Sequence, residues 1–245
     1  MAREVRRPDT PFWVDRGRVE GARLTLDPDE SHHLLHVFRA TPGTPFEATD
    51  GEGRLYRCTL EALDRDVAVG RVDSVSEGAG ELAFSIHLLV GLPDTAAVEA
   101  IVEHAVPLGV TAIDFAVAAR SGRPALEEKR LARLDRVARA AVKQSRRTRL
   151  PRVGSSPSVE AGIAALPYGG LRLVAQADGE TRIETPPEGI QGAVSLAVGP
   201  PGGFIEWELG VLRGAEFAPI SLGPSRLTTE TASISLLAMV RNSLL

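Results

Sequence analysis

Residues 193–204 read AVSLAVGPPGGF, and residues 217–232 read FAPISLGPSRLTTETA. In each stretch a short apolar run breaks into a glycine-containing loop, and a helix-like pattern follows. Each run is therefore typical of a short buried strand that leads through a loop into a helix. In open α/β sheets, ligands bind at such loops because the loops lie at the carboxyl ends of the strands. Since glycine lets a ligand approach the main chain closely, we expect the two loops to form a cofactor site.

Similar strand and helix signals precede these loops in the sequence. Residues 86–90 form a continuous apolar run, and Asp94 is suited to cap the helix that follows. Gly109 is placed to end that helix in the left-handed conformation, and residues 112–117 form the next strand. Together with residues 171–175 and the two glycine-loop runs, the pattern predicts five parallel strands in an α/β domain.

The first part of the chain has a different pattern. Short, partly alternating apolar runs separated by turn signals predict a small β-barrel over residues 1–75. An acidic start at residues 27–30 predicts a helix over residues 31–39. The small, polar, glycine-containing segment 76–81 marks the domain boundary, so we expect the second domain to span residues 82–245.

The composition is ordinary for a globular protein, with 43% hydrophobic and 24% charged residues in a chain of 245. The single cysteine excludes an internal disulfide and fits a reducing compartment, so we expect a cytoplasmic protein. The N-terminus lacks the apolar segment of a signal peptide, and no apolar run approaches the roughly 20 residues that span a bilayer. The net charge of −4 argues against a protein that is basic throughout.

Histidine and cysteine residues in the first domain raise the question of metal or thiol chemistry. His32 and His36 have a spacing that suits a metal-binding helix. We favour a packed or surface helix, because no glutamate lies between them as in H-E-x-x-H and no cluster of further ligands follows. Cys58 is expected to be a buried barrel residue, since nothing nearby in the sequence suggests an activating base. We therefore expect no metal site.

A strongly basic stretch runs over residues 129–152, with ten lysines and arginines against one acid, Asp135. Apolar residues such as Leu134 and Val142 recur at helical spacing, so many of the cations share an outer face. Such a face can be merely solvated, but its density of charge favours a polyanion partner. Each cation that meets a phosphate would then add a salt-dependent increment to the affinity.

Six short motifs also occur in order along almost the whole chain. They are His32-His33-Leu34 with Val37 and Arg39; Glu99 with Leu108-Gly109-Val110; Arg120-Ser121; Gln144-Ser145 with Arg147 and Pro151; Gly199-Pro200 and Gly202-Gly203-Phe204 with Glu208; and Leu222-Gly223, Leu227 and Glu230-Thr231-Ala232. In this combination the chain resembles the RsmE family of ribosomal RNA methyltransferases, members of the SPOUT superfamily.

The resemblance implies an N-terminal PUA-like barrel for RNA and a C-terminal α/β domain whose chain forms a deep trefoil knot. It also implies a homodimer that binds S-adenosyl-L-methionine in the knot loops and methylates N3 of one uridine in 16S rRNA of the small ribosomal subunit. The residues expected to bind this cofactor are Leu173, Ala175, Val198, Gly199, Pro200, Gly202, Gly203, Phe204, Leu222, Gly223, Leu227, Thr231 and Ala232. The residues expected to contact RNA are Arg39, Arg120, Arg133, Arg136, Arg139, Lys143 and Arg146.

The chemistry of this transfer suggests catalytic residues. The uracil must be unpaired or extruded, because N3 lies on its Watson–Crick edge. As N3 loses its proton, negative charge spreads to two carbonyl oxygens, and a positioned arginine would stabilise that charge. Arg226 and Arg147 are the candidates. Glu230 is a candidate for orienting an arginine or removing the proton, and a helix-capping role is the alternative, because acids favour first turns.

The chain departs from the family pattern at three places. Pro201 stands where the family usually has a glutamate, residues 225–228 read SRLT where the family usually reads RILR, and residues 91–94 replace a lysine-containing loop. A divergent active methyltransferase is the first hypothesis. The altered loop motivates a second, in which a catalytically impaired protein binds rRNA during ribosome assembly. A third is a different α/β enzyme with a nucleotide cofactor, and the missing phosphate-binding fingerprints count against it.

Overall fold

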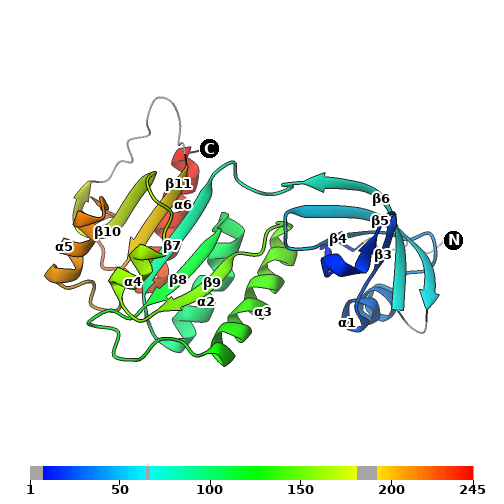
Figure 1. The fold of residues 1–245 in the computed structure, drawn as a ribbon, viewed down its shortest axis with the longest axis horizontal. Helices are drawn as coiled ribbons and strands as arrows, with labels where there is room; N and C mark the ends of the chain where they lie inside the picture. Colours follow the sequence, from blue (N-terminus) through cyan, green and yellow to red (C-terminus); the bar gives the residue numbers. More distant parts are fainter. Residues whose placement is uncertain (1–7, 65–66, 181–191, 245) are drawn as a thin grey trace. The chain divides into compact units, whose positions relative to one another are not determined.

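The computed structural model of the chain describes residues 8–64, 67–180 and 192–244. The chain divides into two compact units, Met1–Glu81 with Arg139–Leu150, and Leu82–Ala138 with Pro151–Leu245 (Figure 1). The segment Arg139–Leu150 thus groups with the N-terminal unit, although the sequence places it inside the second domain.

A parallel sheet forms the centre of the second unit. Its neighbouring strands all pair in parallel, in the spatial order β12-β10-β11-β7-β8-β9. The strands are β7 (Ser85–Gly91), β8 (Ala112–Ala116), β9 (Arg152–Ser156), β10 (Leu171–Glu180), β11 (Ala193–Val198) and β12 (Ala218–Ile220). The five predicted strands are confirmed. The sixth, β9, was missed because its sequence RVGSS has no apolar run, and only its register with β8 identifies it.

Helices cover both faces of this sheet (Figure 1). Helices α2 (Thr95–Ala105) and α6 (Thr229–Leu244) pack on one face, and α4 (Val159–Ala164) and α5 (Glu206–Gly214) on the other. Two local predictions are confirmed. The Asp94 carboxylate accepts from the Ala96 and Ala97 N–H groups at 3.0 Å, and Gly109 has φ +95° after the short helix η3 (Val106–Leu108).

The remaining long helix, α3 (Glu128–Ser145), carries the basic stretch and gives its last residues to the first unit. Its apolar side includes the buried residues Leu134 and Val142, as the helical spacing predicted. Among the described residues, none of the helices combines the length and apolar character needed to cross a bilayer. The trefoil knot stays a prediction.

The first unit contains a curled sheet in the order β1-β4-β5-β6-β3-β2, in which β1 pairs with β4 in parallel and the other pairs are antiparallel. The expected barrel is therefore a sheet whose edge strands are β1 and β2. Its strands are β1 (Phe12–Trp13), β2 (Val19–Glu20), β3 (Arg23–Thr25), β4 (Pro45–Thr49), β5 (Arg54–Asp64) and β6 (Val67–Glu77), with a short helix η1 (Arg16–Arg18). Helix α1 (Pro28–His32) continues into the π-helical turn η2 (His33–Val37), and the Asp27 carboxylate accepts from the Glu30 N–H at 2.8 Å.

Cys58 is buried in the apolar core of this unit, which confirms the prediction made for it. Burial raises the pKa of its thiol to about 12, so the thiolate is not formed near neutral pH. The His32 and His36 rings lie beside each other with centroids 4.5 Å apart on the surface of the helix. No third metal-ligating side chain joins them among the residues that the structure describes.

Candidate cofactor pocket

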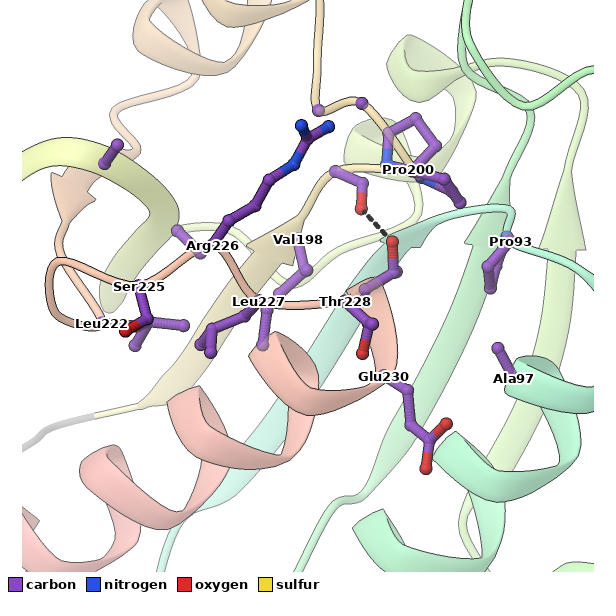
Figure 2. Close-up of a pocket in the computed structure, with 18 of the residues that line it drawn as sticks. Pro93, Ala97, Val198, Pro200, Leu222, Ser225, Arg226, Leu227, Thr228 and Glu230 are labelled. Carbon is purple, nitrogen blue, oxygen red and sulfur yellow. Dashed lines mark hydrogen bonds between the residues drawn. The ribbon is translucent and has the colours of Figure 1, made fainter.

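A cavity of about 1180 Å³ in the second unit lies over the carboxyl ends of β12, β11 and β7 and beside residues 175–177 of β10. Its walls are the loop after β11, the loop between β12 and α6, the middle of β10 and the first turns of α2 (Figure 2). The two glycine loops that the sequence singled out thus meet in one pocket, as predicted. Most of the lining consists of glycine, alanine, proline and main chain, so the pocket offers backbone polar groups to a ligand.

A tight turn shapes the loop after β11. The Gly203 N–H donates to the Pro200 carbonyl at 2.7 Å, and Gly202 has φ +93°. These are the features of a type II turn, in which proline favours the second position and glycine the third. Pro201 and Gly202 occupy those two positions, which gives a physical reason for the proline that stands where the family usually has a glutamate.

Contacts from other elements fix this loop. A Cβ built on Gly91, at the end of β7, would lie 2.3 Å from Pro200 Cδ, so only glycine leaves room for Pro200. The Thr229 hydroxyl at the start of α6 donates to the Gly199 carbonyl at 3.0 Å, which joins the two glycine loops (Figure 2). The loop after β8 reaches it as well, because the Arg120 guanidinium donates to the Gly202 carbonyl.

The loop between β12 and α6, with the first turn of α6, presents several polar side chains to the pocket. Arg226 is exposed, and Figure 2 shows its side chain extending from this loop beside the loop of Pro200. Thr228 caps α6 by accepting from the Thr231 N–H at 3.2 Å. Glu230 therefore does not supply the cap; its carboxylate lies in the first turn, 3.9 Å from His104 Nδ1.

Most of the predicted cofactor residues line the pocket. These are Ala175, Val198, Gly199, Pro200, Gly202, Gly203, Leu222, Gly223, Leu227 and Ala232, together with the catalytic candidates Arg226 and Glu230. Three predicted residues do not line it. Leu173 and Phe204 are buried in the strand and core beneath the loops, and the Thr231 hydroxyl interacts with Thr228 instead.

Sequence reasoning missed the wall made by α2 and, apart from Ala175, the wall made by β10. Asp94, Ala96, Ala97 and Ala100 line the pocket from α2, and Gln176 and Ala177 line it from β10. The signal for the first group was present, because Asp94 follows β7 in the way that the glycine loops follow β11 and β12. The small side chains of α2 carry no chemical signature, so only the fold brings them to the site.

Arg147 requires a correction. Its side chain is 4% exposed, belongs to the first unit, and forms an ion pair with the equally buried Glu81 at 2.6 Å. The Glu81 carboxylate also accepts from the Thr148 and Arg149 N–H groups at 2.8 Å. The structure thus gives Arg147 a structural partner, and it is not among the residues that line the pocket.

The cations expected to contact RNA are less free than the sequence suggested. In the second unit, Glu99 of α2 pairs with Arg130 at 2.5 Å and with Arg133 at 2.9 Å. In the first unit, Lys143 pairs with Glu30, Arg146 pairs with Glu47, and the Arg139 guanidinium lies 4.8 Å from the centre of the Trp13 ring. Arg39 and Arg136 are exposed, and neither has an ion-pair partner among the described residues.

A smaller cavity of about 230 Å³ lies between β7, β8, β9 and α4. Burial raises the pKa of Asp114, while a hydrogen bond from Ser156 and the charge of Arg152 oppose that shift. Burial, with a smaller contribution from the Arg152 charge, lowers the pKa of His87. Asp114 Oδ2 and His87 Nδ1 are both buried without a hydrogen-bond partner in the described structure.

One unit with a curled β sheet, and a second with a parallel sheet and a pocket at the carboxyl ends of its strands, define a two-domain α/β protein. In this class of fold the loops at those strand ends are where ligands bind. Two family models match in the corresponding places, an RNA methyltransferase domain over residues 80–241 and an RNA methyltransferase PUA domain over residues 26–72. The ribosomal RNA small subunit methyltransferase E of Mycobacterium bovis is 33% identical over 239 residues, covering 94% of this chain and 90% of the relative. The chain therefore belongs to the family of ribosomal RNA small subunit methyltransferase E.

Two further relatives agree. The enzyme of the same name from Synechocystis is 30% identical and covers 91% of this chain and 74% of the relative. The crystal structure of the Neisseria gonorrhoeae ribosomal RNA small subunit methyltransferase E bound to S-adenosyl methionine has a TM-score of 0.81, at 24% identity, and covers 96% of this chain and 97% of that one. The resemblance seen in the sequence is thus confirmed, and the fold extends over both units.

Proposed function

We propose that this protein transfers a methyl group from S-adenosyl-L-methionine to N3 of a specific uridine in 16S rRNA of the small ribosomal subunit, in the cytoplasm. The observation that carries the proposal is the pocket in which both glycine loops expose main-chain groups at the carboxyl ends of the strands. The family of the chain and the S-adenosyl methionine bound to the Neisseria relative support this choice of cofactor.

The lining residues fit such a cofactor. Gly202 and Gly203 have φ of +93° and +76° and carry no side chains, so a ligand can approach the main chain of the loop after β11 closely. The loops at Gly199–Gly203 and Leu222–Leu227 would hold the adenosine and methionine parts, with Ala97 and Ala100 of α2 opposite them. When bound, S-adenosylmethionine supplies an electrophilic methyl group on a sulfonium.

The work left to the protein is to position the base and to stabilise charge. Arg226 extends from the pocket wall and is suited to bind the carbonyl oxygens of a uracil as N3 loses its proton (Figure 2). Glu230 lines the same pocket and is our candidate for taking that proton or for orienting Arg226. The arginine of the altered loop would thus retain the charge that the transfer needs, although the loop sequence differs from the family pattern.

RNA binding is assigned to the first unit and to the exposed cations of α3. Arg136 gives a sharp test, because Glu99 neutralises Arg133 on the same helix but does not contact Arg136. We expect Arg136→Ala to lower the affinity for a 16S rRNA fragment and to reduce the salt slope by about one. Arg133→Ala is the matched control, with a smaller change. An unchanged affinity and salt slope for Arg136→Ala would show that Arg136 does not contact phosphate.

Two measurements test the proposal as a whole. Calorimetry should show S-adenosylhomocysteine binding to the pure protein, and mass-spectrometric mapping should show a methylated uridine in 16S rRNA that is lost on deletion of the gene. Absence of cofactor binding would refute the proposal. Cofactor binding with an unchanged rRNA modification pattern would favour an rRNA-binding role in ribosome assembly. The homodimer belongs to the same proposal, and ultracentrifugation tests it.

A further inference from the structure

We propose that Glu208 and Arg120 form a clasp that holds the loop after β11 in its ligand-binding shape, with Glu208 acting as a positioning residue for the cofactor. Neither side chain lines the pocket. This inference rests on the proposed function, because the loop that the clasp holds lines the pocket proposed to bind the cofactor.

Glu208 is a buried carboxylate shared between two loops. Its side chain sits in the first turn of α5, and the residue is 4% exposed. One oxygen, Oε1, accepts from the Ala119 N–H in the loop after β8 at 2.7 Å. The other, Oε2, accepts from the Ile205 N–H at the end of the loop after β11 at 2.9 Å. Hydrogen bonds to a charged acceptor are the stronger ones, so this carboxylate ties the two loops to each other.

Two further hydrogen bonds fix the loop after β8 where Glu208 holds it. The Ser121 hydroxyl accepts from the Ala118 N–H at 3.0 Å, and the Ser121 N–H donates to the Ala118 carbonyl at 2.9 Å. Arg120 lies in this turn, between Ala118 and Ser121 in the sequence. Its guanidinium donates to the Gly202 carbonyl, and its Cδ would lie 3.4 Å from a Cβ at Gly202.

The clasp therefore acts on one peptide group of the turn. The peptide between Gly202 and Gly203 has its N–H bonded to the Pro200 carbonyl and its C=O bonded to Arg120. With both polar ends held, this peptide keeps its orientation. Pro201 and Gly202 line the pocket, and within the described part of the chain no hydrogen bond uses the Gly202 N–H, so this N–H is available to a ligand. Pre-ordering the turn removes an ordering cost from binding.

Glu208→Gln is a sharp test, because glutamine keeps the shape but has one acceptor oxygen where the carboxylate has two. Either the Ala119 N–H or the Ile205 N–H must then face the amide NH₂ group of the glutamine and lose its acceptor. The loop that contains that N–H group is no longer held by residue 208. Glu206→Gln is the matched control. It makes the same change in the same helical turn, at an exposed carboxylate whose partner is Arg213 at 2.5 Å. Arg120→Ala is the second variant, because it removes the donor to the Gly202 carbonyl by truncating an exposed side chain.

Calorimetric titration with S-adenosylhomocysteine should show an affinity at least about tenfold lower for Glu208→Gln and for Arg120→Ala. The affinity of Glu206→Gln should equal that of the native protein. Hydrogen exchange in the ligand-free protein should be faster over residues 199–205 in the first two variants only. Native affinity and native exchange there, even with a lowered melting temperature, would overturn the clasp. If the native protein itself fails to bind, the proposed function fails, and the exchange data still decide on the clasp.

Discussion

Replacement of Gly91 by alanine tests whether the loop after β11 is part of the binding site. Gly91 ends β7, and the new methyl carbon would lie 2.3 Å from Pro200 Cδ and 2.5 Å from Pro200 N. Because carbon atoms attract at about 3.5–4.0 Å and repel strongly when closer, Pro200 must move by about 1 Å or more. The proline ring cannot turn away, and Thr229 holds the adjacent Gly199 carbonyl.

The cost of this substitution follows from the overpacking. Forcing a methyl group into a packed site costs about 1–3 kcal/mol, so urea denaturation should show a free energy of unfolding lowered by that amount. The displaced loop should also bind S-adenosylhomocysteine at least about tenfold more weakly, since about 1.4 kcal/mol of lost interaction corresponds to that factor. Calorimetry on the folded variant measures this second effect separately from stability.

Gly210→Ala is the matched control. Gly210 lies inside α5, and its new Cβ would meet only Arg213 Nη2 at 4.0 Å. Because glycine in a helix interior is less stable than alanine, this variant should gain about 0.5–1 kcal/mol without any change in affinity. If Gly91→Ala binds S-adenosylhomocysteine as tightly as the native protein, the loop of Pro200 does not form the site, and the reasoning fails.

Two further predictions concern buried charges. Arg147→Ala should lower the free energy of unfolding by about 3–5 kcal/mol, because it leaves the buried Glu81 carboxylate without a positive charge beside it. A loss of turnover with native stability would instead restore Arg147 as a catalytic candidate. Burial raises the pKa of Asp114 above its ordinary 3.8, so the folded state holds this proton more tightly than the unfolded state, and stability falls as pH rises through the folded value. Asp114→Asn should therefore be more stable than the native protein at pH 7, with the difference vanishing in denaturation curves below about pH 4, and an equal difference at both pH values would contradict the assignment.

The sequence predicted those elements whose signals are local. An apolar run that breaks into glycine identified β11 and β12, and a capping aspartate identified the start of α2. The strand β9 has no such signal, because a Gly-Ser segment becomes a strand only by pairing with β8. The pocket wall from α2 was missed for a similar reason, since alanines acquire a role only from their place in the fold.

The basic stretch shows a second limit, which is electrostatic. Within residues 129–152 the sequence offers one acid, so the cations look uncompensated. The structure supplies acids from far along the chain, with Glu81 66 residues from Arg147, and Glu30 113 residues from Lys143. The net charge of a short sequence segment is therefore a poor guide to the electrostatic potential of the surface that it forms, because ion pairing depends on distance in space.

Because the pocket is lined mostly by main chain, we expect the substitutions that lower cofactor affinity to fall at different positions than in a site formed by side chains. Its lining offers mostly main chain, so replacing one small lining residue by another changes few interactions, and the proline at position 201 is compatible with the same turn. The shape of the main chain is set instead by residues that do not line the pocket, namely Gly91 and Glu208. Cofactor affinity should therefore be more sensitive to these supporting residues than to most of the residues that a ligand would touch. A departure from the family pattern within the loops is therefore weaker evidence for loss of cofactor binding than a substitution at one of these supporting residues would be.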